Sequence, residues 1–150
     1  MPYDNLRKGR HSEANRAYFV TTVLADRKKR YFADFLCARR VVNEMRILHD
    51  HEMVVSLAWV IMPDHVHWLF QLTDKVDLSS VMKQLKARSA HSVNAYLNRK
   101  GPLWQKAFYD HGVRDGEDIR GIACYIVANP VRAGLVEKLG DYPHWDAIWL

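Results

Sequence analysis

Two apolar segments, separated only by Pro63-Asp64, restrict the fold of this chain more than any other feature of its sequence. Residues 53–62 read MVVSLAWVIM and residues 65–72 read HVHWLFQL, and both are rich in β-branched and aromatic side chains. Each run therefore predicts a largely buried strand. A parallel pair would need a crossover connection of about a dozen residues or more. The two strands must therefore pair as an antiparallel hairpin.

The remaining segments add strands and helices on both sides of this hairpin. Residues 16–25 predict a strand, and residues 103–114 a short strand with a loop. Apolar residues at helical spacing predict three helices, over 34–51, 78–98 and 119–130. Phe35 is placed on the apolar stripe of the first of these helices, and Asp77 is the expected N-cap of the second. The C-terminal segment is expected to add a short helical turn within 131–138 and an aromatic tail, 141–145, that packs on the body.

This order of elements predicts an α+β fold, with a mostly antiparallel sheet and helices packed on it. The chain has 150 residues, 49% of them apolar, which suits a single domain over residues 1–150 with one sizeable core. No linker or internal repeat divides it. Residues 1–15 are polar and are expected to form a flexible basic arm.

Several classes of protein are excluded by what the sequence lacks. It has no apolar run of 18 residues, so no membrane span is expected, and its start does not have the apolar centre of a signal peptide. Cys37 and Cys124 have no CxxC partner, which favours reduced, buried thiols and a cytoplasmic location. HExxH, GxSxG and glycine-rich phosphate loops are all missing.

The charge pattern favours a polyanionic partner. Lysine and arginine number 22 against 17 acidic residues, for a net charge of +5. Basic side chains gather in the N-terminal arm and on the second predicted helix, where they leave the apolar stripe. These residues are Arg7, Lys8 and Arg10 in the arm, and Lys83, Lys86 and Arg88 on the helix. They face either solvent or a ligand.

The motif His65-Val66-His67 provides the first candidate for chemistry. Residues i and i+2 of a strand point to the same face, so the two imidazoles would lie side by side. Such a pair is the start of a divalent-metal site, which needs a third ligand and an open position. The candidates for the third ligand are Asp64, His111, Asn129 and the acidic residues of 115–118. The alternative is a pair of ordinary core or edge histidines.

Tyr125 and Asn129 provide the second candidate. At positions i and i+4 they share one face of the last predicted helix, at the edge of its apolar stripe. A phenol there could pack its ring and still reach a cleft with its hydroxyl. Because Asn129 precedes Pro130, and residues before proline avoid the helical region, the helix could instead end at Ala128. An isolated tyrosine in this position could also be a simple packing residue.

Four stretches of the sequence together resemble the REP-associated tyrosine transposases, relatives of the single-tyrosine HUH transposases of small insertion sequences. They are residues 58–68 (AWVIMPDHVHW), 103–111 (LWQKAFYDH), 113–115 (VRD) and 125–136 (YIVANPVRAGLV). They occur in the order and at the spacing of that family. The His-x-His and Tyr-x-x-x-Asn-Pro-Val motifs are specific in combination.

The resemblance implies a ferredoxin-like α+β sandwich that cleaves and rejoins single-stranded DNA beside the hairpin of a repeated extragenic palindrome (REP). It implies that His65 and His67 hold a divalent metal, Mg²⁺ or Mn²⁺, with Asn129 as an amide-type third ligand. Tyr125 would be the nucleophile, forming a covalent 5′-phosphotyrosine. The base for Tyr125 is left open between a water and His111.

Single-stranded DNA with a REP-type hairpin is thus the expected partner, bound by a monomer in the bacterial cytoplasm and on the nucleoid. The basic residues of the arm and of the second helix would contact phosphates, and aromatic side chains would stack on bases. The expected DNA-binding residues are Arg7, Lys8, Arg10, Lys83, Lys86, Arg88, Trp104, Gln105 and Arg114. Phe108 and Tyr109 are further candidates for stacking.

Two alternatives stay open. The chain could be a catalytically silent DNA-binding regulator at repeated palindromes, although a pure binder would not need His65, His67 and Tyr125 together. It could also be an unrelated metal hydrolase, although a carboxylate-rich ligand set is missing. A covalent protein–DNA adduct that depends on Tyr125 distinguishes these alternatives from the transposase.

Overall fold

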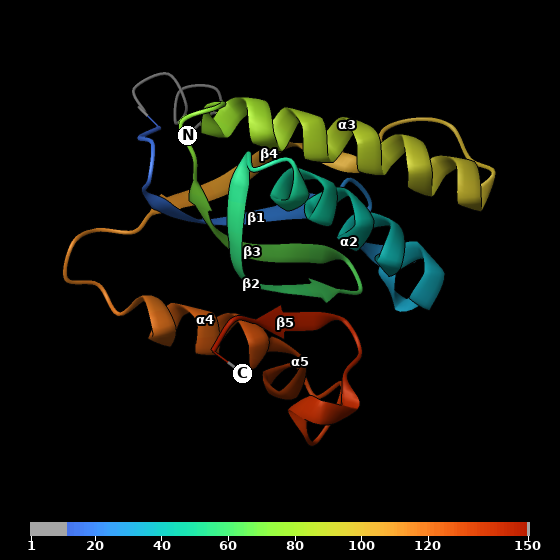
Figure 1. The fold of residues 1–150 in the computed structure, drawn as a ribbon. Helices are drawn as coiled ribbons and strands as arrows, with labels where there is room; N and C mark the ends of the chain where they lie inside the picture. The colour runs from blue at the N-terminus through green and yellow to red at the C-terminus, as the bar shows by residue number, and fades with distance from the viewer. Residues whose placement is uncertain (1–11, 150) are drawn as a thin grey trace.

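A computed structural model describes residues 12–149 of the chain (Figure 1). The predictions for Arg7, Lys8 and Arg10 lie outside the described residues. The elements are β1 (Ala17–Leu24), η1 (Arg27–Lys29), η2 (Tyr31–Ala33), α2 (Phe35–Asp50), β2 (Val54–Met62), β3 (His65–Leu72), α3 (Leu78–Leu97), β4 (Trp104–Gly112), α4 (Ile119–Val127), α5 (Asn129–Arg132), η3 (Leu139–Asp141) and β5 (Trp145–Ala147).

The strands form one sheet in the order β4-β1-β3-β2-β5, and every neighbouring pair is antiparallel. The first four strands and the helices α2 and α3 follow the β-α-β-β-α-β plan of a ferredoxin-like fold. The predicted fold class, an α+β sandwich with a central antiparallel sheet, is therefore confirmed.

The predicted hairpin of β2 and β3 is present and its turn is held from outside. Met62 pairs with His65, so that only Pro63 and Asp64 form the connection. The backbone N–H of Phe32 donates to the carbonyl of Pro63 at 3.1 Å, and that of Leu24 donates to the carbonyl of Asp64 at 2.9 Å. The turn that precedes the two histidines is thus tied to the last residue of β1 and to the segment that follows it.

One face of the sheet carries the larger core, under α2 and α3 (Figure 1). Alternate residues of β1 and β3 point into it, including Val20, Trp68 and Phe70, each at most 1% exposed. Asp77 caps α3 as predicted, because its carboxylate accepts from the N–H of Ser80 at 2.8 Å. This helical layer leaves the opposite face of the sheet for the other residues of each strand.

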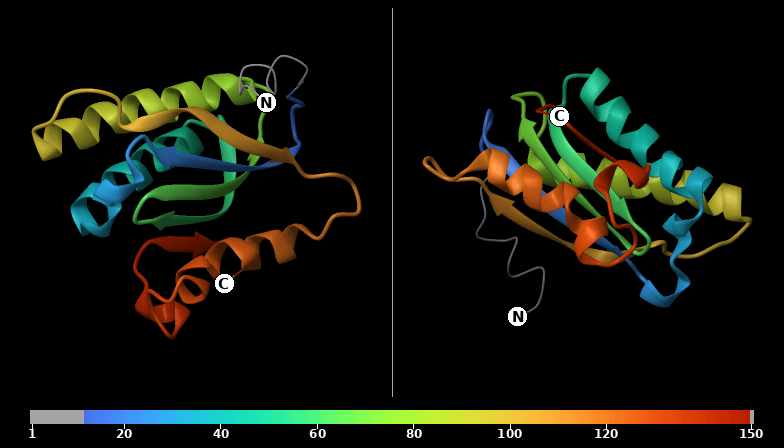
Figure 2. Two further views of the ribbon diagram at one scale, coloured as in Figure 1. Left: turned by 180° about the vertical axis from the view of Figure 1, so that it is seen from behind. Right: turned by 90° about the horizontal axis from the view of Figure 1, so that it is seen from below.

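The opposite face carries a second, smaller core under α4 (Figure 2). Ile126 and Val127 of α4 are buried there against Leu69 of β3 and Val60 of β2. Helices therefore cover both faces of the sheet. His65 and His67 lie in the same alternation as Leu69, and so on the α4 face.

The structure corrects three details of the sequence prediction at the C-terminal end. The tail forms an edge strand, β5, which pairs with β2. The last long helix ends at Val127, and a separate short helix, α5, begins at Asn129. Cys124 is exposed and not buried, because it lies on the solvent side of α4, whereas Cys37 is buried as expected.

Phe35 is also misplaced by the prediction. Its side chain is 53% exposed and does not join the apolar stripe of α2. Phe35 is the first residue of that helix, and its ring lies against that of His144 with centroids 5.1 Å apart.

The aromatic tail does pack on the body as predicted. The hydroxyl of Tyr142 donates to the carbonyl of Ile61 at 2.6 Å, and burial raises the pKa of Tyr142 to about 12.

Among residues 12–149, no helix is both long enough and apolar enough to cross a membrane.

We expect His144 to make the fold sensitive to acid. This side chain is 4% exposed, and its buried Nδ1 has no hydrogen-bond partner within the described residues. Burial, and then the nearby charge of Arg39, lowers the pKa of His144 below its ordinary value of 6.5. The unfolded chain therefore binds the proton more readily, and the free energy of unfolding should fall as the pH drops below about 6.5.

Chemical denaturation of wild type and His144→Phe between about pH 7 and about pH 5 measures this effect. The variant keeps an aromatic ring between Phe35 and Tyr142 and loses the titrating group. Its unfolding free energy should depend less steeply on pH than that of the wild type. Equal slopes for the two proteins would contradict the assignment.

Candidate active site

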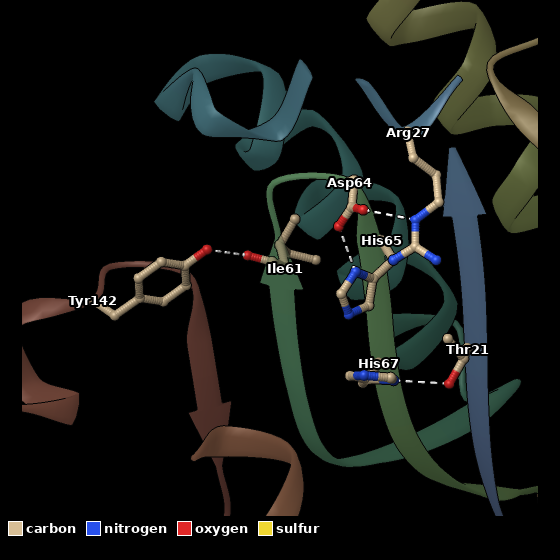
Figure 3. A network of polar contacts seen from close by, with 7 residues as sticks. All are labelled: Thr21, Arg27, Ile61, Asp64, His65, His67 and Tyr142. Carbon is tan, nitrogen blue, oxygen red and sulfur yellow. Dashed lines mark hydrogen bonds and ion pairs between the residues drawn. The ribbon is translucent and has the colours of Figure 1, made fainter. Parts of the chain in front are cut away.

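Two histidines of the central strand form the centre of the site (Figure 3). The rings of His65 and His67 stand on the α4 face of β3 with their centroids 4.7 Å apart and their planes at 76°. Both side chains are partly buried. The predicted side-by-side placement of the two imidazoles is therefore present.

Each histidine is held through its Nδ1 atom. The Nδ1–H of His65 donates to Oδ1 of Asp64 at 2.6 Å, and the other carboxylate oxygen of Asp64 accepts from Nε of Arg27 at 2.8 Å. The Nδ1 of His67 lies 2.8 Å from the hydroxyl oxygen of Thr21 on β1. With both Nδ1 atoms engaged, Nε2 is the nitrogen that each ring can offer to a ligand (Figure 3).

The electrostatics of the pair favour a neutral imidazole at His67. Burial, followed by the charges of His65 and Arg132, lowers the pKa of His67 to about 3. At Asp64, burial raises the pKa, but the hydrogen bonds from His65 and Arg27 outweigh it and the pKa lies below its ordinary value. Asp64 is thus an anion that accepts from two donors, which orients His65 and does not make it a third ligand.

The donor set fits a divalent metal ion. A metal-binding histidine usually has its second nitrogen hydrogen-bonded to a carboxylate or another oxygen, and Nδ1 of each ring here lies within hydrogen-bond distance of such an oxygen. Between Ser12 and Trp149, no group of three or more His, Cys, Asp or Glu side chains could hold a metal. A third protein ligand would therefore have to be of another type, such as the amide of Asn129.

Tyr125 lies on α4, the helix that covers this face of the sheet. Its neighbours Ile126 and Val127 are buried against the sheet, whereas its own side chain is 55% exposed. The guanidinium carbon of Arg132 lies 3.9 Å from the centroid of the Tyr125 ring, and its Nη2 donates to the carbonyl of Tyr125 at 2.7 Å. The phenol is therefore accessible to a large substrate and is held at its ring face.

Asn129 is placed by the break between α4 and α5. Its Nδ2 donates to the carbonyl of Ile126 at 3.0 Å and contacts that of Tyr125 at 3.4 Å, so the amide nitrogen caps α4. The carbonyl oxygen Oδ1 is the atom that remains able to bind a metal. The predicted i, i+4 relation of Tyr125 and Asn129 is thus present although the helix ends between them.

A row of side chains across four strands shows where the site opens. Val60 of β2, His67 of β3, Thr21 of β1 and Tyr109 of β4 are paired in register on the α4 face. Val60 is fully buried under α4, His67 and Thr21 are partly buried, and Tyr109 is 59% exposed. The histidines therefore stand at the border between the covered and the open half of this face.

His111 and the acidic residues after it do not join the histidine pair. His111 lies on β4, two strands away from β3, and its Nε2 is 3.0 Å from Oε1 of Glu117. Glu117 also accepts from the backbone N–H of Arg114, and Asp118 caps α4 through the N–H of Gly121. These contacts leave them outside the candidate ligand set.

Trp104 is not available for base stacking, so that prediction is wrong. It is 5% exposed, packs against Phe32 with ring centroids 5.3 Å apart, and donates from Nε1 to Ser89. Phe108 is equally buried, because both side chains point to the face under α3. Of the three aromatic candidates, only Tyr109 is exposed.

Two of the predicted basic contacts are engaged within the protein. Nζ of Lys86 donates to the carbonyls of Gln105, Lys106 and Ala107 at 2.7, 3.1 and 3.4 Å, and so ties α3 to β4. Arg88 forms an ion pair with Glu44 at 2.8 Å. A role for either in DNA binding stays a prediction.

Other members of the predicted DNA-binding set lie along β4. Lys83 is exposed on α3 and lines a groove of about 510 Å³ between α3 and β4, together with Gln105 and Lys106. Arg114 is exposed just after β4. The structure thus places a basic groove beside the strand that carries Tyr109.

Sequence reasoning missed three residues of the site, one of which is Arg27, the partner of Asp64. Nothing along the chain indicates that Thr21 meets His67, because only the register of β1 and β3 brings them together. Arg132 carries a weak signal, since it lies seven residues after Tyr125 and two helical turns bring such residues to the same side.

Comparison with known proteins agrees with this geometry. Residues 14–129 match the family model described as "Transposase IS200 like". The chain belongs to this family of DNA transposases, enzymes that cleave and rejoin DNA.

Individual relatives define the branch of the family. A REP-associated tyrosine transposase of Escherichia coli K12 is 27% identical over 128 residues, covering 84% of this chain and 73% of its own. A Haemophilus influenzae protein named "Putative REP-associated tyrosine transposase" is 32% identical over 141 residues, covering 85% of this chain and 77% of its own. A solved REP-associated tyrosine transposase, bound to a REP hairpin, has a TM-score of 0.77 at 24% identity and covers 91% of this chain and 79% of its own. The resemblance to this group seen in the motifs is thereby confirmed.

We expect Lys86 to stabilise the folded protein by holding α3 against β4. Lys86→Met removes the donor to three carbonyls at the start of β4 and should reduce the free energy of unfolding by about 1–3 kcal/mol. Lys83→Met, on the exposed side of the same helix, is the matched control and should leave stability nearly unchanged. Urea denaturation of the two variants measures the difference. Equal stability, with an equal loss of DNA affinity, would instead assign Lys86 to DNA.

Proposed function

We propose that this chain cleaves and rejoins single-stranded DNA beside a REP-type hairpin, through a covalent bond between Tyr125 and a 5′-phosphate. One observation carries the proposal. An accessible tyrosine stands on the helix that covers the same sheet face as His65 and His67, and both imidazoles are oriented by Nδ1 contacts.

The reaction that we propose is a transesterification that consumes no cofactor. The phenol oxygen of Tyr125 attacks the phosphorus of a DNA phosphodiester, and the O–P bond forms as the P–O3′ bond breaks. The phenol proton leaves to solvent or a base, and the departing 3′-oxygen takes up a proton. A 3′-hydroxyl of another strand can reverse these steps, because the phosphotyrosine keeps the energy of the ester. Rejoining therefore needs no ATP.

Nε2 of His65 and of His67, with Oδ1 of Asn129, would hold the divalent metal, Mg²⁺ or Mn²⁺. The metal would act as a Lewis acid on a phosphate oxygen and offset negative charge in the transition state. Mg²⁺ prefers oxygen ligands, whereas imidazole suits Mn²⁺ better. Asp64 and Thr21 would keep the rings in the orientation that binding requires.

The partner that we propose is single-stranded DNA with a REP-type hairpin. The relative of known structure is bound to a REP hairpin, and the net charge of +5 on this chain suits a polyanion. Lys83 and Gln105 in the α3–β4 groove, and Arg114 after β4, would contact the backbone. Tyr109, exposed in the row of His67, would stack on an unpaired base. A monomeric state and a cytoplasmic location stay predictions.

Tyr125→Phe should abolish the covalent reaction and keep DNA binding, because only the attacking oxygen is removed. Wild type and variant are incubated with a labelled single-stranded oligonucleotide that carries a REP hairpin, with Mn²⁺, with Mg²⁺ or with chelator. We expect a denaturant-resistant adduct in the wild type alone, and only when metal is present.

The same assay separates the alternatives. Binding of the hairpin by both proteins, without an adduct under any condition, would indicate the catalytically silent regulator. An adduct that survives Tyr125→Phe would assign the nucleophile to another residue. Cleavage without an adduct would indicate a metal hydrolase.

Asp64→Ala should weaken metal binding before any reaction takes place. Loss of the carboxylate frees the ring of His65 to rotate, and such a change usually lowers metal affinity by about 10- to 100-fold. Titration calorimetry of the DNA-free protein with Mn²⁺ measures this. Asp115→Ala, which removes an exposed acid outside the histidine pair, is the control and should bind as the wild type does. Equal affinities in the two variants would contradict the role of Asp64.

A further inference from the structure

A single arginine contacts the candidate nucleophile through both its ring and its backbone. Arg132 is the last residue of α5, a helix that packs against β2. It makes two separate contacts with Tyr125: the guanidinium carbon lies 3.9 Å from the ring centroid, and Nη2 donates to the backbone carbonyl at 2.7 Å.

These contacts restrain a side chain that would otherwise be loose. The Tyr125 ring is 55% exposed, and no hydrogen bond to its hydroxyl is made within residues 12–149. An exposed phenol of this kind samples several rotamers. The guanidinium lies over the ring face, and one of its own nitrogens is hydrogen-bonded to the backbone carbonyl of the same tyrosine. These two contacts together remove much of that freedom.

We propose that Arg132 is a positioning residue for the nucleophile: from α5 it clamps the Tyr125 ring and so restricts where the phenol oxygen can lie when the phosphate is bound. This inference rests on the proposed function and adds the device that orients its nucleophile. In-line attack requires near-contact geometry, and a misplacement of about 1 Å can reduce a rate about 100-fold. A restraint on the tyrosine therefore acts on the rate of the chemical step more than on DNA affinity.

The arrangement also predicts that lysine would substitute poorly for Arg132. A guanidinium can stack its plane on the ring while one of its edge nitrogens donates to the carbonyl. An ammonium group is a compact donor on a flexible stem and cannot do both at once. Arg132→Lys should therefore recover part of the loss that Arg132→Gln causes.

The experiment follows adduct formation in a single turnover, with enzyme in excess over a hairpin oligonucleotide and Mn²⁺ present. For Arg132→Gln we expect a rate about 10- to 100-fold below wild type, with hairpin affinity within about twofold. Arg132→Lys should fall between the two. Arg120→Gln removes the same charge from an exposed position of α4 that does not contact Tyr125, and should react at the wild-type rate.

A second measurement tests the clamp without any reaction. In the DNA-free protein, the ring current of Tyr125 should shift the δ-methylene protons of Arg132 upfield. The shift should persist in Tyr125→Phe, which keeps the ring, and disappear in Tyr125→Leu. Thermal melting of each variant shows whether loss of the carbonyl contact unfolds α4 and so accounts for the rate.

The outcomes are distinct from those that test the proposed function. An adduct that forms in Arg132→Gln at the wild-type rate overturns the clamp and leaves the function intact. A loss of hairpin affinity equal to the loss of rate also overturns it, since Arg132 would then be a DNA contact. An absent ring-current shift overturns it whatever the kinetics show. If the wild type forms no adduct at all, the proposed function fails. The ring-current shift then remains as the test of whether Arg132 restrains the Tyr125 ring.

Discussion

The pairing of β1 with β3 is the constraint on which the rest of the structure depends. It places Thr21 opposite His67 and Val23 opposite His65, and so decides which oxygen meets the second imidazole. Because side chains alternate, the same register sends Val20 and Trp68 into the core under α2 and α3. A slip of one residue would bury the histidines in that apolar core and expose its aromatic side chains.

The two cores differ in how completely helices cover their face of the sheet. The larger one, under α2 and α3, is closed and contains most of the buried aromatic side chains, Trp104 included. The smaller core lies between α4 and the strands β2 and β3, and α4 leaves Tyr109 on β4 exposed. A site at the edge of a helix-covered face can combine a partly buried, neutral His67 with a phenol that a large substrate can reach. The polar network of Arg27, Asp64, His65 and Thr21 then fixes the rings from the sheet side.

Much of this architecture was predictable. The hairpin follows from two β-rich segments joined by only two residues. The long helices follow from apolar spacing near 3.6 residues, and the shared face of His65 and His67 from the two-residue period of a strand. All of these are local properties of the chain. The pairing of Tyr125 with Asn129 followed from the same spacing. The motifs, taken together, indicated the transposase family, which the family model confirmed. Local patterns failed where tertiary packing decides whether an aromatic side chain is buried: Trp104 lies in the core, and Phe35 lies outside it.

By itself, the sequence determined the two strands that flank Pro63-Asp64, the order of the elements and the residue types that bear the chemistry. Only the tertiary structure decided that Asp64 orients His65 in place of binding a metal, that Thr21 supports His67, and that Arg132 stacks on Tyr125. The physical reason is that each of these contacts depends on how separate elements are placed against one another. Strand register and the packing of α5 on β2 arise from the burial of whole faces, and a pattern of single residues does not specify them.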